Sequence, residues 1–323
     1  MQIVSQLVFA VVLGVAVYIF YRQVSKVRRN ILLGKAEDRN DRKKERLSTM
    51  LRVAFGQTKM VRRPIPALLH FFVYIGFILI NIEILEIIID GLAGTHRIFM
   101  EPLGVVYNIA IGFFEILGVL VLVSCVIFLI RRFALKVPRL NMAELKGWPM
   151  KDAANILIIE IVLMAALLVM NAADRPFQEA ANMPISSLIA PLFSGMNDSN
   201  LHTVERVAWW AHIIGVLAFL NYLPFSKHWH IIMAFPNTYY SNLEPKGEFP
   251  NPPEITTEVK LAMDFSATPP EGYQPPTSFG VKDVTDLGWK NLMDAYSCTE
   301  CGRCTAVCPA NITGKKLSPR KIM

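Results

Sequence analysis

Five stretches of the chain consist almost entirely of apolar residues, and each is about as long as a membrane crossing requires. A helix rises 1.5 Å per residue, so about 20 residues cross the roughly 30 Å of bilayer hydrocarbon. The pattern therefore predicts an all-α membrane protein built on a bundle of five helices. The predicted spans are Ile3–Tyr21, Ile65–Ile89, Val105–Ile130, Ala153–Met170 and Val207–Phe225, the last continuing as a helix to about Phe235.

Residues beyond the fifth span change character twice. From Pro236 to Gly288 the chain is polar and holds nine of its 20 prolines, a composition without the apolar content for a core. This composition predicts an extended strap along the membrane domain. A short helical pattern follows at Val284–Tyr296. We interpret residues 1–235 as the transmembrane domain, 236–283 as a Pro-rich linker, and 284–323 as the start of a further domain.

Charge gives the predicted bundle an orientation. The chain has 33 Lys+Arg against 26 Asp+Glu, yet residues 22–63 alone hold 14 basic and four acidic residues. That segment therefore carries +10, and the remainder sums to −3. Loops rich in Lys and Arg stay on the cytoplasmic side. We expect an outside N-terminus and a cytoplasmic C-terminal region, as in a multi-pass protein of a bacterial-type inner membrane.

The same distribution argues against nucleic-acid binding, because the basic residues sit between two apolar runs instead of spreading over a docking face. The first span has no basic residue before it and no small-residue cleavage site after it, so we interpret it as a retained anchor. The loops at 90–104 and 171–206 have few basic residues and are expected outside. Met183–Met196 is apolar but too short to cross, which favours an interfacial or re-entrant segment.

Four of the five cysteines form the most specific motif in the chain. Cys298, Cys301, Cys304 and Cys308 have the spacing C-x₂-C-x₂-C-x₃-C-P, which bacterial ferredoxins use to hold a [4Fe–4S] cluster. Structural zinc is the alternative, but zinc sites usually use two separated pairs of ligands. Such clustering also excludes a secreted disulfide framework. The sequence therefore predicts a ferredoxin-like iron–sulfur domain.

The fourth cysteine of the motif bears on the number of clusters. In two-cluster ferredoxins the fourth cysteine of one run ligates the other cluster. Here the fifth cysteine, Cys125, lies inside the third span and cannot complete a second run. We expect two clusters in the whole protein, with a second run beyond Met323 or a ligand from a partner.

Two histidines fall at the same predicted depth. His70 lies about four residues inside the cytoplasmic end of span two, and His230 lies at the cytoplasmic end of span five. Depth alone predicts that they share one b-type haem. The alternative is a pair of hydrogen-bonded polar residues, although ionisable residues inside membranes tend to be functional.

A second haem is a further possibility. On a continuous helix His212 and His230, 18 residues apart, would share one face and stand about 27 Å apart. A kink at Pro224, which lies between them, is the alternative and would remove this alignment. His212 has no histidine opposite it in span two, so its second ligand stays open; His96 and His202 are in external loops. His228 is some 200° from that face and is expected to meet lipid headgroups or haem propionates, with haem ligation as the alternative. Trp209 and Trp210 are expected to be aromatic belt anchors.

Acidic residues also occur within the spans. Glu83, Glu86 and Asp90 share one face of span two, and Glu115 and Glu160 lie in spans three and four. Asp90 is expected to reach the outer interface. Quinol oxidation must release two protons, so Glu83 and Glu86 are candidates for a proton path beside a quinone site.

These features resemble a known arrangement. Five spans with His70, His212 and His230 resemble the cytochrome b (gamma) subunit of respiratory nitrate reductase, although that family has two histidines in span two and this chain has one. The segment Ser226–His230, the Pro-rich strap and Trp289–Arg320 resemble membrane-bound iron–sulfur oxidoreductases related to heterodisulfide reductase. That resemblance implies a cytochrome b domain fused to a dicluster ferredoxin domain. Electron-transfer-flavoprotein:menaquinone oxidoreductases are close relatives in this grouping.

The sequence thus predicts an oxidoreductase: the membrane subunit of a quinone-linked electron-transfer complex. Electrons would pass between menaquinone, haem b, the cytoplasmic cluster and a soluble partner. The resemblance implies that this partner is a cysteine-rich CCG-type iron–sulfur protein or an electron-transfer flavoprotein. Electron-transfer-flavoprotein:menaquinone oxidoreductase activity is one alternative, and a non-redox anchor for an iron–sulfur assembly is another. Broken-helix repeats and nucleotide-binding glycine loops are absent from the sequence, which argues against a transporter and a nucleotide-binding enzyme.

Overall fold

The computed structural model describes residues 2–61, 63–180, 183–245, 247–248, 251–276 and 279–323. Within these ranges the chain is helical, and its only β pairing is an isolated bridge between Lys35 and Gly288. Among the described residues, five helices are long and apolar enough to cross a membrane, in agreement with the five predicted spans. They are α1 (Gln2–Ile31), α3 (Pro64–Ala93), α5 (Val105–Phe133), α6 (Trp148–Ala173) and α9 (Asp198–Tyr222).

Shorter helices connect and extend the five. Those of the first half are α2 (Lys43–Met50), the π-helix η1 (Leu51–Phe55), α4 (Met100–Leu103), η2 (Pro138–Leu140) and η3 (Ala143–Leu145). Those before the fifth span are α7 (Arg175–Ala180), α8 (Ser186–Ile189) and η4 (Ala190–Phe193). Those after it are η5 (Leu223–Phe225), η6 (Lys227–Trp229), α10 (His230–Tyr239), α11 (Pro253–Met263), η7 (Val284–Asp286), α12 (Trp289–Ser297), α13 (Arg303–Ala306), α14 (Pro309–Ile312) and α15 (Pro319–Ile322).

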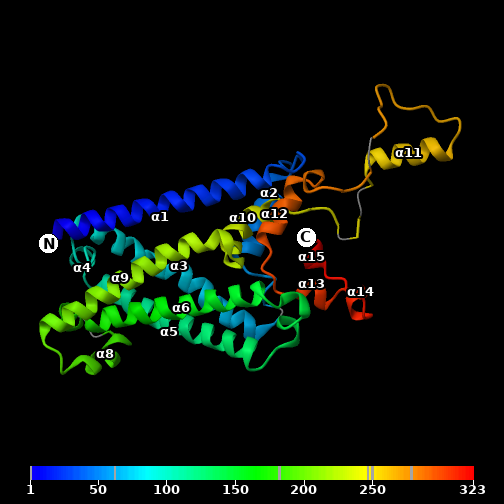
Figure 1. Cartoon of the computed structure of the whole chain (residues 1–323). Coiled ribbons are helices and arrows are strands. Elements are labelled where there is room, and N and C mark those ends of the chain that lie inside the picture. Colours follow the sequence, from blue (N-terminus) through cyan, green and yellow to red (C-terminus); the bar gives the residue numbers. More distant parts are fainter. Residues whose placement is uncertain (1, 62, 181–182, 246, 249–250, 277–278) are drawn as a thin grey trace.

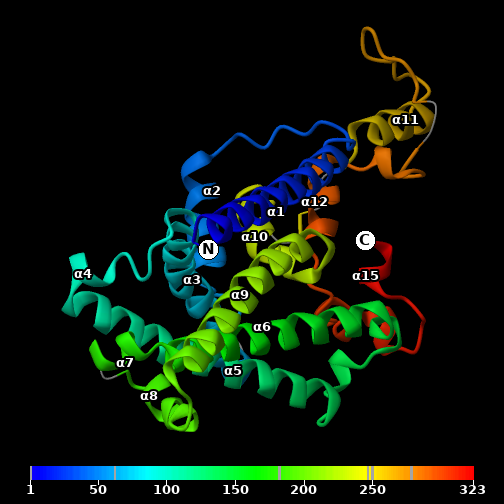
Figure 2. The ribbon, with the colours of Figure 1, turned by 60° about the vertical axis from the view of Figure 1, so that its left-hand side comes forward.

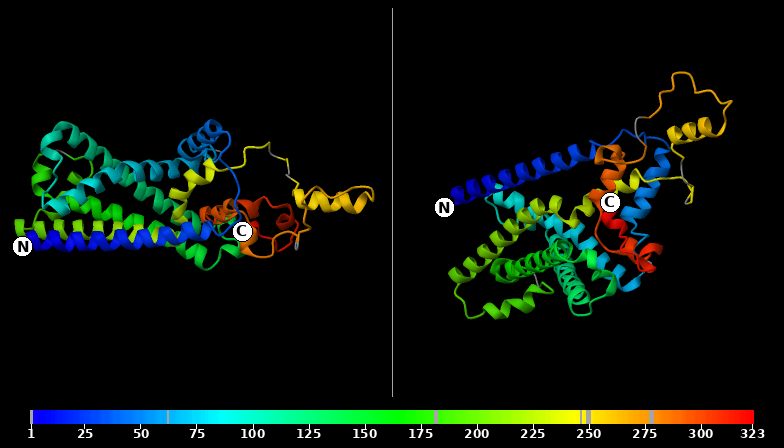
Figure 3. Two further views of the ribbon diagram at one scale, coloured as in Figure 1. Left: turned by 90° about the horizontal axis from the view of Figure 1, so that it is seen from above. Right: turned by 45° about the vertical axis from the view of Figure 1, so that its right-hand side comes forward.

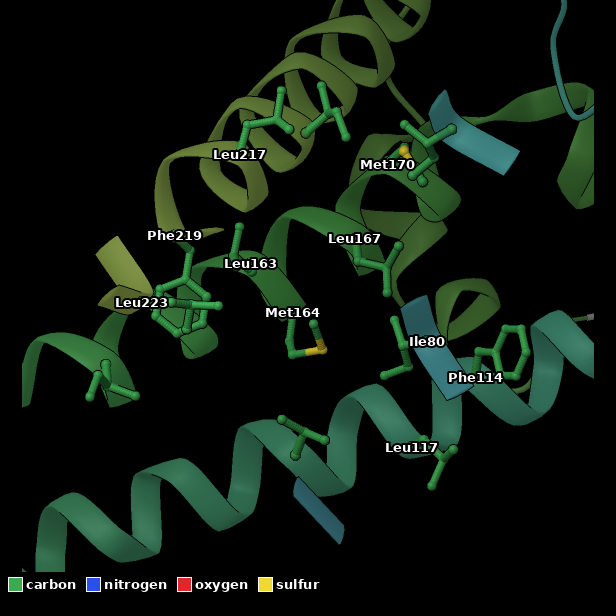
Figure 4. Packing of buried hydrophobic residues seen from close by; sticks show 14 of the residues in the cluster. Ile80, Phe114, Leu117, Leu163, Met164, Leu167, Met170, Leu217, Phe219 and Leu223 are labelled. Carbon is green, nitrogen blue, oxygen red and sulfur yellow. The ribbon is translucent and has the colours of Figure 1, made fainter. Parts of the chain in front are cut away.

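The long helices pack against one another in a ring, in which each makes its main contacts with two others. Helix α6 contacts α5 and α9, α3 contacts α5, and α1 lies along α3 and α9 (Figures 1 and 2). Their apolar side chains meet in the interior, where Ile80, Leu117, Met164 and Leu217 come from four different helices (Figure 4). Such interdigitation makes the bundle a single packed core.

Span five ends earlier than the apolar pattern predicts. Helix α9 stops at Tyr222, two single-turn 3₁₀ helices follow, and α10 begins only at His230. Pro224 has no N–H to continue the helical hydrogen bonds, and Ser226 is extended at φ −113° and ψ 160°. The expectation of one continuous helix to about Phe235 is therefore wrong, and so is the helical arithmetic that placed His212 and His230 on one face.

The Pro-rich linker is not extended throughout. Residues Pro253–Met263 form the helix α11, which starts at a proline in its first turn, a position where proline is well tolerated. Figure 3 shows α11 and its flanking loops standing away from the bundle. The helix expected at Val284–Tyr296 is divided at Leu287–Gly288 into η7 and α12. Helix α12 packs on α1, α10 and η6, so the C-terminal segment rests against the bundle.

The two ends of the bundle differ in chemistry. One end, here called the cysteine end, holds Cys298–Cys308 with η6, α10 and α12. The opposite end, where α9 starts, is here called the tryptophan end, because Trp209 and Trp210 in the middle of α9 line a cavity there with His96. The basic segment after α1 is also at the cysteine end, where α2 and η1 pack on α10.

Candidate redox centres and the buried acids

His70 of α3 and His230 of α10 lie next to each other at the cysteine end. Their ring centroids are 6.5 Å apart, and the rings are inclined by 46°. A metal–nitrogen bond to imidazole is about 2 Å and the ring centre lies roughly 1 Å further, so two rings on one metal stand about 6 Å apart. The observed separation therefore suits a single metal ion between the two rings.

The protonation of the His230 ring also suits ligation. Its Nδ1 lies 2.9 Å from the backbone oxygen of Lys227. A carbonyl oxygen can only accept a hydrogen bond, so Nδ1–H donates and Nε2 keeps its lone pair. Metal-binding histidines commonly have their other nitrogen fixed in this way.

His228 joins this group from the turn η6. It is only 8% exposed, and its ring centroid is 5.7 Å from that of His230 and 5.1 Å from that of Phe219. Its position in the interior contradicts the expected contact with lipid headgroups. It is the nearest replacement for His230 as a ligand.

His212 is separate from these three rings. It is fully buried on α9, and its Nδ1–H donates to the backbone oxygen of Leu163 over 2.9 Å. Its Nε2 has no hydrogen-bond partner among the described residues. Neither histidine of the external loops lies beside His212, because His96 is hydrogen-bonded to Asp174 and His202 is 73% exposed. His212 therefore has one nitrogen free to bind a metal and no second histidine opposite it in the described chain.

The cysteine loop is built as a tight curl. All four of its thiols are free. Gly302 has a φ of +71°, and a Cβ there would lie 2.5 Å from the backbone oxygen of Arg139. Only glycine fits such a left-handed position at so close an approach. The Glu300 backbone N–H lies 3.5 Å from Cys298 Sγ and donates to it.

The loop offers thiolate ligands for a cluster but does not gather them. Among the described residues, no group of three or more His, Cys, Asp or Glu side chains has the arrangement to hold a metal ion. Burial raises the pKa of the Cys298 thiol, the Glu300 N–H lowers it, and the neighbouring Cys301 raises it further. A short curled loop with four free thiols and an N–H directed at sulfur fits a cluster by its donor set.

Polar contacts hold the cysteine loop against the turn that precedes His230. Glu300 Oε2 is 3.1 Å from Lys227 Nζ, and Glu300 Oε1 accepts from Arg320 Nη1 over 2.6 Å. Arg139 Nη1 donates to the Cys301 oxygen over 3.0 Å. Lys227, Glu300 and Arg320 line a cavity of about 320 Å³, together with Trp229 and Cys298.

Glu83 is an acid buried without partners. It is 3% exposed, and both of its carboxylate oxygens lack a hydrogen-bond partner within the described chain. Glu86, one turn further along α3, accepts from the Tyr107 hydroxyl over 2.8 Å and from the Phe99 N–H over 3.0 Å.

Arg97 is the centre of a buried network at the tryptophan end. It is 8% exposed, and its φ of +49° turns the side chain inward from the loop after α3. Its guanidinium donates to Asp174 Oδ2 over 2.7 Å, to Asn171 Oδ1 over 2.9 Å and to the Tyr107 hydroxyl over 3.2 Å. It also lies 3.6 Å from the ring centre of Phe177. Through Tyr107 the network reaches Glu86.

Glu115 of α5 joins the network through Asn171. Its Oε1 accepts from Asn171 Nδ2 over 3.1 Å, and its Oε2 accepts from the N–H groups of Ile185 and Ser186. Glu160, the acid of the fourth span, is 9% exposed. The acids of the bundle are therefore interior groups.

The network continues to a cavity. Asp174 Oδ2 lies 3.0 Å from His96 Nε2, and both residues line a cavity of about 830 Å³ together with Phe9, Trp209 and Trp210. Burial raises the pKa of Asp174, but hydrogen bonding to His96 and the charge of Arg97 outweigh it and lower that pKa to about 2. The carboxylate is therefore ionised at neutral pH.

Two sequence expectations at this end are wrong. Asp90 does not reach the interface: it is 7% exposed and accepts hydrogen bonds from Thr95 Oγ1 and the N–H groups of Arg97 and Ile98. Trp209 is 7% exposed, and its ring centroid lies 5.5 Å from that of Phe9, so it is a core residue and not a belt anchor. In the segment Met183–Met196, Leu188 and Leu192 are 75% and 80% exposed on short helices, as an interfacial segment would be.

Comparison with known proteins gives two extensive matches. The chain is 32% identical over 324 residues to the "Probable iron-sulfur-binding oxidoreductase FadF" of Bacillus subtilis, covering 99% of this chain and 42% of that protein. It is 29% identical over 299 residues to the "EtfAB:quinone oxidoreductase" of Syntrophomonas wolfei, covering 90% of this chain and 38% of that protein. No protein-family model and no solved structure matches the chain.

A third match is short. Over 44 residues the chain is 43% identical to a "Probable membrane-anchored ferredoxin" of Chromohalobacter salexigens, which is 14% of this chain and 7% of that protein. The chain spans about two fifths of the length of the first two relatives. Both extensive relatives are named as oxidoreductases, and one of them is named for iron–sulfur binding. This chain resembles them over a segment that includes five membrane-type helices among its described residues.

Proposed function

We propose that this chain is the membrane-anchored part of a quinone-linked iron–sulfur oxidoreductase of the heterodisulfide-reductase-like type. Cys298, Cys301, Cys304 and Cys308 would hold a [4Fe–4S] cluster and His70 with His230 would hold a haem b, and these groups would supply one-electron transfer between a soluble redox partner and menaquinone. One observation carries the proposal: the His70–His230 ring pair, 6.5 Å between centroids, lies at the same end of the bundle as the cysteine loop. Two potential redox sites far apart in sequence are thus neighbours in the fold.

In this proposal His70 and His230 hold one haem b, which supplies one-electron chemistry within the bundle. The ring separation and the free Nε2 of His230 support this assignment. His212, with its unpartnered Nε2, is the position from which a second haem would be held. Because no second histidine is brought to it in the described chain, we commit to one haem.

Cys298, Cys301, Cys304 and Cys308 hold iron–sulfur in the proposal, with Cys308 available to a second cluster, as in two-cluster ferredoxins. The relatives named for iron–sulfur binding and ferredoxin support the same assignment. The basic residues after α1 favour a cytoplasmic location for this end in a bacterial-type inner membrane.

Quinone chemistry also requires protons. Reduction of a quinone to a quinol consumes two electrons and two protons, and oxidation of the quinol releases them. Glu83 is the proposed proton-exchanging group, because its buried carboxyl group has no partner. Glu86, Tyr107, Arg97 and Asp174 provide a hydrogen-bonded connection from this region to the cavity at the tryptophan end.

The soluble partner in the proposal is an electron-transfer flavoprotein, because the name of one extensive relative includes EtfAB:quinone oxidoreductase activity. A cysteine-rich CCG-type iron–sulfur protein is the second candidate, from the heterodisulfide-reductase-like resemblance. The proposal does not need a nucleic-acid partner.

The test uses the full-length natural protein in lipid nanodiscs with menaquinone. Reduced electron-transfer flavoprotein is added anaerobically, and the b-type haem absorption and the quinol content are followed. We expect haem reduction followed by quinol formation in proportion to flavoprotein oxidised. Haem that is reduced by menaquinol but not by the flavoprotein would move the assignment to the CCG-type partner. A protein that holds iron–sulfur but shows no haem absorption would make it a non-redox membrane anchor and contradict the proposal.

A further inference from the structure

Glu300 is an unusual residue within the cysteine loop. It lies between Cys298 and Cys301 and has a φ of +48°, a left-handed conformation that residues with a side chain adopt infrequently. This conformation accompanies two contacts made at once: the backbone N–H donates to Cys298 Sγ, and the carboxylate lies between Lys227 Nζ and Arg320 Nη1. Strained backbone of this kind persists where the surroundings hold it, and it gathers at functional sites.

Lys227 is the counterpart of Glu300 on the histidine side. Its side chain is 12% exposed, and its Nζ donates to the Pro149 oxygen over 2.6 Å as well as pairing with Glu300. Its backbone N–H donates to Asp152 Oδ2 over 2.9 Å, which fixes the turn η6 to α6. Its backbone oxygen accepts from His230 Nδ1–H. The same residue therefore orients His230 and binds the cysteine loop.

These contacts form one connected path. It runs from Cys298 Sγ to the Glu300 N–H, from the Glu300 carboxylate to Lys227 Nζ, and from the Lys227 oxygen to His230 Nδ1. The His70 ring follows at 6.5 Å. Each link is a hydrogen bond or an ion pair. The Lys227 and Glu300 side chains are 12% and 22% exposed, so solvent screens their ion pair less than a surface pair.

We infer that the Glu300–Lys227 pair is the positioning joint that couples the cysteine loop to the histidine pair. The inference rests on the proposed function, which places a cluster on the cysteines and a haem between His70 and His230. Glu300 and Lys227 take part in no chemical step. Their role is to hold the cysteine loop and the histidine pair at a fixed separation, across which single electrons would be transferred. Hydrogen bonds to cluster sulfur and to the second nitrogen of a ligating histidine also tune the metal they surround.

Glu300→Gln tests the joint, because it removes the charge and keeps the shape. The matched control is Glu244→Gln, which removes a carboxylate paired with Arg42 at 52% exposure. Lys227→Gln removes the other partner, and Glu300→Asp is the conservative rescue. All are made in the full-length protein, and iron and haem contents are measured first.

Two readouts follow. The first is the rate of haem reduction by a viologen radical, a one-electron reductant, corrected for the direct rate seen in Cys301→Ser. The second is hydrogen–deuterium exchange at residues 298–308. We expect Glu300→Gln and Lys227→Gln each to slow cluster-dependent haem reduction at least tenfold and to speed exchange in the loop. Lys227 also contacts Pro149 and Asp152, and Glu300 also contacts Arg320. The double variant should therefore slow the reaction by much less than the product of the two single effects, since the Glu300–Lys227 interaction is common to both. The control stays within twofold of the unmodified protein, and Glu300→Asp recovers most of the rate.

Two outcomes would overturn the inference. Rates and exchange within twofold of the unmodified protein in both single variants would remove the positioning role and leave the proposed function intact. An unmodified protein without haem or without cluster would overturn the proposed function and this inference together. If Glu300→Gln loses both the cluster and the haem, Lys227→Gln decides the question. Lys227 lies outside the cysteine loop, so this substitution leaves the sequence of the loop unchanged.

Discussion

Arg97 allows a direct test of how much the buried polar network contributes to stability. Arg97→Met removes the guanidinium and keeps a side chain of similar length. The substitution leaves Asp174, whose side chain is 2% exposed, with His96 as its remaining side-chain hydrogen-bond partner. It also takes a donor from Asn171 and from Tyr107.

The expected magnitude follows from this burial. Removing one partner of a buried ion pair typically costs about 3–5 kcal/mol, because the other charge is left without compensation. The control is Arg175→Met, which breaks the nearby pair with Asp198 at 46% and 80% exposure. Exposed pairs contribute roughly 0–1 kcal/mol, so the control should change stability little.

The assay is reversible unfolding of the full-length protein in mixed detergent micelles, followed by far-ultraviolet circular dichroism. We expect Arg97→Met to lower the free energy of unfolding by several times the effect of Arg175→Met. Adding Asp174→Leu to Arg97→Met should recover part of the loss, since a buried pair can be replaced by apolar side chains at little cost. Equal effects of Arg97→Met and Arg175→Met would refute the reasoning.

Three further predictions concern the other sites. Cys301→Ser should abolish the electron paramagnetic resonance signal of the reduced cluster and keep the haem spectrum, while Cys125→Ser, in α5 away from the loop, should change neither. Glu83→Gln should slow quinone turnover by about 10²-fold or more in steady-state kinetics, the usual effect of losing a proton-transfer group, with unchanged haem absorption. The pKa of Asp174 is about 2, below its ordinary value of 3.8, so Asp174 stabilises the fold above about pH 4 and that stability is lost as the pH falls towards 2. Unfolding measured between pH 5 and pH 2 should show this loss, and Asp174→Asn should reduce it.

The long apolar helices were predictable because membrane crossing needs a length and a composition that are visible in the sequence. The positions of His70 and His230 along their spans also predicted that the two residues lie at the same depth in the membrane. In the structure their rings lie next to each other. The break after Tyr222 was visible only as Pro224, whose effect depends on whether Ser226 turns the chain out of the helix. Helix α11 was hidden because proline content alone indicated an extended strap.

The network around Arg97 could not be predicted from the sequence. Arg97 is a single basic residue in a loop with few charges, and nothing in its neighbours indicates a left-handed backbone that turns it inward. Asp90 was expected at the interface because it ends span two, yet three donors from residues 95–98 fold back onto it. Loop paths of this kind depend on tertiary contacts, which periodicity does not report.

The most direct test of the redox assignment is a dithionite-reduced minus air-oxidised absorption spectrum of the full-length protein, recorded beside His70→Ala with iron determined in both. The account predicts a b-type haem difference spectrum in the unmodified protein, its loss in His70→Ala, and equal iron–sulfur content in the two. An unmodified protein without b-type absorption, or a His70→Ala protein that retains all of it, would contradict the assignment of haem to His70 and His230.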